Sequence, residues 1–158
     1  MIAPKLITLE NSIVNAMTEL GNSHNAINMA AGYTDFHCSP ALIDLVQKHI
    51  SEGINEFAPP NGVMELREQV SRKIDHLYGH RYDPGSEITI TAGATQAIFS
   101  TITTLIREGD EVVIFEPAYD SYVPAIEING GKPVFVPLKG PDFHIDWEEV
   151  QKLINPNT

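Results

Sequence analysis

The sequence has a single cysteine, Cys38, so the chain cannot form an internal disulfide, which fits a reducing compartment. Basic residues are also scarce: 10 Lys and Arg stand against 21 Asp and Glu, which gives a formal net charge of −11. Because affinity for nucleic acid comes mainly from Lys and Arg contacts with phosphate, this balance argues against a nucleic-acid partner.

Long apolar runs and targeting signals are missing as well. No run approaches the roughly 20 apolar residues that span a bilayer, and the N-terminal residues show no basic stretch followed by an apolar one. We therefore expect no membrane partner and a cytoplasmic location. The 158 residues, 42% of them hydrophobic, suffice for a globular domain that needs no metal or disulfide to fold.

Apolar residues recur at helical or strand spacing along most of the chain, with Ser, Pro and Gly at the boundaries. Helices are predicted over about 12–20, 40–52, 63–78, 94–107 and 119–128, and after Asp146. Strands are predicted over 87–91, 111–115 and 132–138. From residue 87 onward strands and helices alternate, which is typical of an α/β fold built from parallel βαβ units. So few strands make a thin sheet with open edges, and we expect this architecture to be incomplete.

The segment Ile88–Ala97 joins a predicted strand directly to a predicted helix through small residues. Gly93 permits a tight turn, Ala94 leaves room for a ligand near the backbone, and Thr95 offers a hydroxyl beside the first helical N–H groups. A helix N-terminus of this kind binds anions, so Gly93–Thr95, here called the phosphate loop, suits a phosphate group. The alternative is an ordinary strand-to-helix turn whose small residues serve packing alone.

A second segment, Phe115–Tyr122, follows the next predicted strand and therefore lies at the same edge of the sheet. Tyr119 and Tyr122 stand three residues apart at a predicted helix start, where their rings could stack on a planar ligand. Alternatively, both rings only cover the end of the sheet. Taken together, the phosphate loop and the two tyrosines suit a ligand that is both aromatic and phosphorylated.

These segments, with four others in order along the chain, resemble the N-terminal part of pyridoxal-phosphate (PLP) aminotransferases of class I/II, fold type I. The methionine/aromatic and kynurenine-type branch is the most similar. The motifs that carry the resemblance are Ser12–Met17, Ala31–Phe36, Asn55–Gly62, Thr91–Ala97, Gly109–Val113 and Glu116–Tyr122. The resemblance implies PLP as cofactor and a three-layer αβα large domain with a parallel-type sheet. It also implies a division into a small-domain arm, 1–38, and the first part of the large domain, 39–158.

The resemblance further implies roles for individual residues. Gly93, Ala94 and Thr95 match the loop that holds the cofactor phosphate, and Tyr119 matches the aromatic residue that stacks on the pyridine ring.

Three further positions match the substrate side of the family's site. Gly32 matches the glycine whose backbone lies against the substrate carboxylate, and Tyr122 matches an aromatic residue near the substrate. Phe57 stands where many relatives carry a tyrosine that reaches the phosphate of the partner subunit; lacking the hydroxyl, Phe57 is expected to line the site. A homodimer is implied by the same resemblance.

The family's residues that carry out the chemistry match positions beyond Thr158, among them the lysine that bonds the cofactor and the arginine that binds the substrate carboxylate. We therefore assign no catalytic residue within these 158 and expect this chain alone to be inactive. For the complete protein we expect transfer of an amino group from an apolar or aromatic, methionine-like amino acid to a 2-oxo acid. The alternatives are a PLP-dependent carbon–sulfur β-lyase on the same scaffold and a non-catalytic phosphate-binding α/β module.

Other polar residues suggest metal or thiol chemistry only weakly. His76 and His80 stand four apart, but Gly79 interrupts their helix and no third ligand is evident, so we predict no metal site. Asp146 is better explained as a helix cap, which Glu149 would complete as a capping box. Cys38 lacks an orienting partner and is interpreted as inert.

Overall fold

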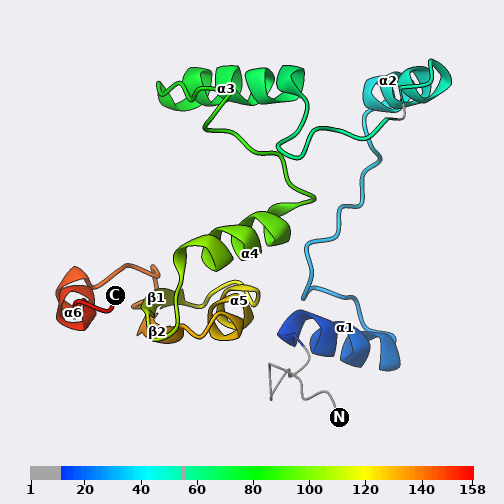
Figure 1. The fold of residues 1–158 in the computed structure, drawn as a ribbon. Helices are drawn as coiled ribbons and strands as arrows, with labels where there is room; N and C mark the ends of the chain where they lie inside the picture. The colour runs from blue at the N-terminus through cyan, green and yellow to red at the C-terminus, as the bar shows by residue number, and fades with distance from the viewer. Residues whose placement is uncertain (1–11, 55) are drawn as a thin grey trace, which may run out of the picture. The chain divides into compact units, whose positions relative to one another are not determined.

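The computed structural model describes residues 12–54 and 56–158, and it divides into two compact units. One unit is Gly32–Thr91; the other joins the residues up to Ala31 with Ala92–Thr158 (Figure 1). The first eleven residues of the predicted arm, 1–38, and Asn55 of the Asn55–Gly62 motif lie outside the described residues.

The unit Gly32–Thr91 contains α2 (Pro40–Ser51) and α3 (Met64–Tyr78). Both helices are confirmed, with boundaries within one residue of the predicted 40–52 and 63–78. Ser39 is the N-cap of α2 and is followed by proline at the first helical position, where the missing N–H does no harm. Gly79 ends α3 in the left-handed conformation, with φ of 67°, that favours glycine at a helix C-terminus.

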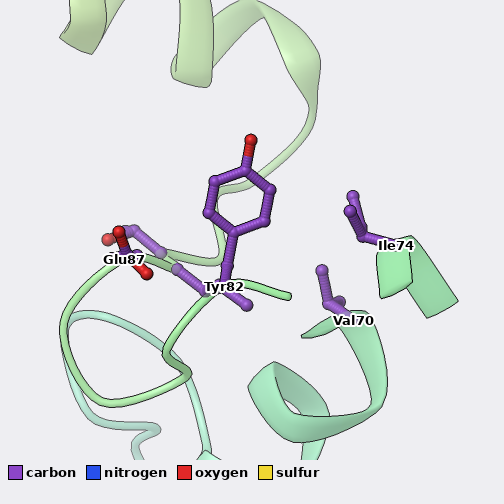
Figure 2. Close-up of a pocket in the computed structure, with 6 residues that line it drawn as sticks. Val70, Ile74, Tyr82 and Glu87 are labelled. Carbon is purple, nitrogen blue, oxygen red and sulfur yellow. The ribbon is translucent and has the colours of Figure 1, made fainter. Parts of the chain in front are cut away.

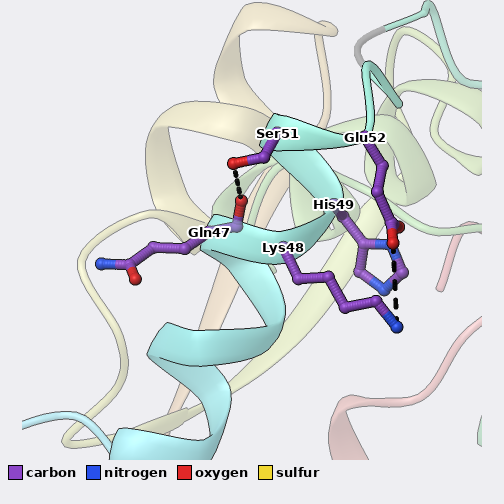
Figure 3. A network of polar contacts seen from close by, with 5 residues as sticks. All are labelled: Gln47, Lys48, His49, Ser51 and Glu52. Carbon is purple, nitrogen blue, oxygen red and sulfur yellow. Dashed lines mark hydrogen bonds and ion pairs between the residues drawn. The ribbon is translucent and has the colours of Figure 1, made fainter.

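The C-terminal turn of α2 carries a small polar network, shown in Figure 3. Lys48 Nζ lies 3.8 Å and His49 Nδ1 3.4 Å from the Glu52 carboxylate, and the Ser51 hydroxyl donates to the Gln47 carbonyl at 2.8 Å. These groups are exposed, and exposed ion pairs stabilise a protein little because solvent screens them. The network therefore adds little stability at the end of α2, and it does not indicate a binding site.

The other unit begins with α1 (Ile13–Ser23), whose N-cap Ser12 accepts a hydrogen bond from the Asn15 N–H at 3.4 Å. The helix runs past its predicted end near residue 20, because Gly21 and Asn22 lie inside it. A single glycine costs a helix only about 1 kcal/mol, so it does not by itself end one.

The rest of this unit holds an α/β arrangement, with α4 (Ala94–Leu105), β1 (Glu111–Glu116), α5 (Tyr122–Ile128), β2 (Lys132–Pro137) and α6 (Trp147–Leu153). β1 and β2 pair in parallel, with Ile114 opposite Phe135, so the predicted βαβ crossover is confirmed (Figure 1). Helix α5 packs on both α4 and β2, and α6 also contacts β2. The buried apolar core lies between these elements and consists of Ile114, Ala125, Ile126, Val136 and Val150.

The predicted strand over 87–91 is wrong for the described residues, whose sheet contains only β1 and β2. A strand exists only where a neighbouring strand supplies a ladder of hydrogen bonds. Ile90 instead donates its N–H to the Asn61 carbonyl at 3.1 Å, a single bond to a loop. Ile88 and Ile90 of this segment are half-buried, but no described strand pairs with it.

The last helix, α6, has the predicted cap at Asp146, but the predicted capping box with Glu149 is only half formed. Asp146 caps α6, its carboxylate accepting from the Glu149 N–H at 3.1 Å. The described residues do not form the reciprocal bond of a capping box; the Glu149 carboxylate pairs instead with Lys139 Nζ at 2.9 Å. This pair raises the pKa of Lys139 through the hydrogen bond and the charge of Glu149.

Helices α1, α2 and α4 bury no residue completely, although each has an apolar side. Leu45 and Ile50 of α2, for example, remain 51% and 58% exposed. In α3 the fully buried residues are polar, Arg67 and Ser71. Among the described residues, no helix is long and apolar enough to cross a membrane.

Candidate functional site

The phosphate loop lies at the opening of α4, where the backbone turns sharply into the helix. Gly93 is the N-cap, with φ of 88° and ψ of 168°, a conformation that side chains disfavour and glycine adopts freely. Among the described residues no side-chain hydrogen bond caps the helix, and Ala94, Thr95 and Gln96 of the first turn are exposed. The positive end of this helix of 12 residues therefore lies among exposed residues, a setting that suits an anion.

Gln96 orders the loop from the other side, a role that the sequence analysis missed. Its side-chain oxygen accepts the Ala92 N–H at 2.6 Å, across the turn made by Gly93. Gln96 is the third helical residue, and glutamine at that position commonly reaches back to the residues before the helix. A glutamine at the third position of the predicted helix was the sequence feature that could have indicated this role of Gln96.

Tyr119 lies beside the phosphate loop, as the two-segment hypothesis requires. Its phenol oxygen is 3.1 Å from the Thr95 hydroxyl, which joins the turn after β1 to the first turn of α4. The side chain is half-exposed, so a ligand can reach it. Hydrogen bonding, first with Thr95 and then with Ser121, lowers the pKa of the phenol below its usual 10.0, while burial and Asp120 act in the opposite direction.

The ring of Tyr122 packs against the ring of Tyr119. The ring centroids are 5.9 Å apart at an interplanar angle of 81°, an edge-to-face contact that aromatic pairs favour. Only Tyr122 opens α5; the prediction that the helix starts at Tyr119 is wrong, because Tyr119 belongs to the preceding turn. In that turn the Tyr119 carbonyl accepts the Tyr122 N–H at 3.2 Å, which fixes the spacing of the two rings.

The remaining predicted residues, Gly32 and Phe57, belong to the unit Gly32–Thr91. Phe57 is fully exposed, and a side chain added at Gly32 would meet nothing within 4 Å, so neither residue serves the packing of its unit. Their position relative to Thr95 and Tyr119 stays a prediction. Within the described residues, no cluster of three or more His, Cys, Asp or Glu could hold a metal ion.

The residues brought together by the structure fit a planar ligand with an anionic head. The N-terminus of α4 and the Thr95 hydroxyl suit a phosphate, and the hydrogen bond from Thr95 to Tyr119 brings the tyrosine ring close enough to contact a flat heterocycle. PLP has these two features.

Comparison with known proteins gives the family of the chain. A model of the family "Aminotransferase class I and II" matches residues 24–158. The chain belongs to this family. Membership implies PLP as the cofactor, and the fold is that of the aminotransferase structures described next.

Among relatives of known name, the methionine aminotransferase of Escherichia coli K12 is 42% identical over 154 residues, covering 98% of this chain and 40% of its own length. A probable N-succinyldiaminopimelate aminotransferase of Mycobacterium tuberculosis is 31% identical over 160 residues, 40% of its own length. The crystal structure of Escherichia coli YbdL, identified as a methionine aminotransferase, matches with a TM-score of 0.94 at 41% identity, covering 100% of this chain and 41% of that one. The chain thus spans about 40% of the length of these relatives.

Proposed function

We propose that the complete protein is a PLP-dependent aminotransferase that moves an amino group from an apolar or aromatic, methionine-like amino acid to a 2-oxo acid. The observation that carries the proposal is the contact between Thr95 and Tyr119 at the exposed N-terminus of α4. Family membership supports the reaction class, and the 42% identity to a methionine aminotransferase supports the substrate class.

In this proposal, Gly93, Ala94 and Thr95 hold the phosphate of PLP through the helix N-terminus and the Thr95 hydroxyl. The Tyr119 ring lies against the heterocycle, and its hydrogen bond to Thr95 keeps the ring in register with the phosphate loop. When bound, PLP supplies an electron sink that stabilises negative charge at the substrate Cα.

The other predicted residues act on the substrate side. The Gly32 backbone lies against the substrate carboxylate, Tyr122 lies near the substrate, and Phe57 lines the site from across a homodimer interface. The exposure of Phe57 supports a role outside its own unit.

The chain described here supplies binding groups, and the complete protein supplies the reactive ones. We assign no catalytic residue within it and propose that it is inactive alone. The uncovered apolar sides of α1, α2 and α4 support the proposal that these helices pack against the remainder of the protein, with 1–38 in the small domain and 39–158 in the large one.

Product analysis with the full-length protein tests the proposal. We expect incubation with methionine, a 2-oxo acid and PLP to give the 2-oxo acid of methionine and a new amino acid in equal amounts. Ammonia and a thiol in place of a new amino acid would contradict it and would indicate a carbon–sulfur lyase. Absence of any PLP binding would contradict both enzymes and favour a non-catalytic module.

A further inference from the structure

The unit Gly32–Thr91 contains a buried arginine that no role described so far explains. Arg67 of α3 is only 5% exposed, and no carboxylate of the described residues lies within ion-pair distance of its guanidinium. A buried charge is costly unless hydrogen bonds compensate the lost water. Backbone carbonyls supply them here: Nε donates to Gly62 at 3.1 Å, and Nη1 donates to Pro84 at 2.6 Å and to Gly85 at 3.5 Å.

The first of these carbonyls belongs to a glycine pressed against a neighbouring segment. Gly62 has φ of 91°, and a Cβ added there would lie 2.5 Å from Ile90 Cγ1. The preceding residue, Asn61, accepts the Ile90 N–H at 3.1 Å. The loop that ends at Gly62 therefore contacts Ile90 through both packing and a hydrogen bond. Arg67 donates a hydrogen bond to the Gly62 carbonyl of the same loop.

The other carbonyls belong to the turn that leads into the Ile90 segment. Ser71, one helical turn after Arg67, donates its hydroxyl to the Tyr82 carbonyl at 2.5 Å. Asp83 closes the turn, accepting from the Gly85 N–H at 2.8 Å and from the Ser86 hydroxyl at 2.7 Å.

The same side of α3 continues with apolar residues. Val70 and Ile74 line a pocket with Tyr82 and Glu87, as Figure 2 shows. Positions 67, 70, 71 and 74 share one helical face, so a single face of α3 carries all these contacts.

The two segments held by Arg67 lead to residues of the proposed site. The loop over 56–62 contains Phe57, and Ile90 precedes Gly93 of the phosphate loop by three residues. We propose that Arg67 is a positioning residue for PLP binding, acting through Gly62 and Ile90 on the phosphate loop and on the loop of Phe57. This inference rests on the proposed function.

A planar guanidinium is required because one group must donate to carbonyls of two separate segments. Lysine carries a single ammonium on a flexible stem and cannot reproduce this fork. In Arg67→Met the Gly62 and Pro84 carbonyls lose their donor altogether. Because a hydrogen bond to a charged group changes an equilibrium constant by roughly tenfold to a hundredfold, we expect PLP affinity to fall by up to that factor in Arg67→Met and Arg67→Lys.

Arg72 offers a matched control on the same helix, because it is exposed and pairs with Glu68, at 3.6 Å. The test uses full-length protein and three measurements: hydrogen exchange of the Ile90 amide without cofactor, the dissociation constant for PLP, and rescue of both by methylguanidinium. We expect Arg67→Met to speed Ile90 exchange and weaken PLP binding, methylguanidinium to restore part of each, and Arg72→Met to match wild type.

Arg67→Met that melts at lower temperature yet keeps wild-type Ile90 exchange and PLP affinity would overturn the inference, because Arg67 would then only stabilise the fold. Arg67→Lys is measured in the same way should Arg67→Met fail to fold, and wild-type values in that variant would also overturn it. Wild-type protein that binds no PLP would overturn the proposed function instead. Ile90 exchange, which needs no cofactor, would still decide whether Arg67 positions its two segments.

Discussion

Replacing Gly62 by alanine tests the close approach of the 56–62 loop to Ile90. Two costs combine at this position. The φ of 91° costs an L-residue about 1–2 kcal/mol, and the new Cβ would lie 2.5 Å from Ile90 Cγ1, an overlap that costs about 1–3 kcal/mol once the neighbours shift. We therefore expect Gly62→Ala to lower the free energy of unfolding by about 2–5 kcal/mol.

Gly53→Ala separates the two costs. Gly53 has a similar φ of 79°, but a Cβ there would meet nothing within 4 Å, so only the conformational cost of about 1–2 kcal/mol remains. Both variants are compared with wild type by urea unfolding of the full-length protein, with the slope checked for two-state behaviour. Equal destabilisation by the two substitutions would refute the contact between Gly62 and Ile90.

Two further predictions concern single carboxylates. Asp146→Ala removes the cap of α6 and should cost about 1 kcal/mol of unfolding free energy by urea titration, whereas Asp142→Ala, an exposed position nearby, should cost almost nothing; equal effects would contradict the cap. Hydrogen bonds from the Ser86 hydroxyl and then the Gly85 N–H lower the pKa of Asp83 below its usual 3.8. The stabilising contribution of the Asp83 carboxylate is therefore complete above pH 3.8 and is lost as the pH falls through the lowered pKa. Asp83→Asn should therefore flatten the decline of stability with pH in this acidic range, and an unchanged slope would contradict the assignment.

Local chemistry made several features predictable from sequence. Ser12, Ser39, Gly79 and Asp146 define helix ends through their own side chains or conformations, and the structure places each at the end expected. The parallel pairing of β1 with β2 followed from alternating apolar strands and helices, because only a crossover connection suits that order.

Features that depend on distant partners were not predictable. The segment 87–91 has strand-like sequence, but whether it forms a strand depends on a neighbour that its own residues do not specify. In the sequence, nothing distinguishes Arg67 from the other charged residues of α3. Its burial depends on two loops whose carbonyls accept its hydrogen bonds. The pairing of Thr95 with Tyr119 was expected at the level of two adjacent loops, whereas the hydrogen bond itself needed coordinates.

The most direct test of the central claim is the dissociation constant of PLP for full-length protein carrying Tyr119→Phe, Tyr119→Ala or Tyr78→Ala. Tyr119→Phe removes only the hydrogen bond to Thr95 and should weaken binding about two- to tenfold. Tyr119→Ala also removes the ring, so it should bind more weakly still and shift the absorbance of the bound cofactor. Tyr78, an exposed tyrosine at the end of α3, is the control, and its variant should match wild type. Identical affinity and absorbance in all four proteins would contradict the claim that the N-terminus of α4 and Tyr119 together hold the cofactor.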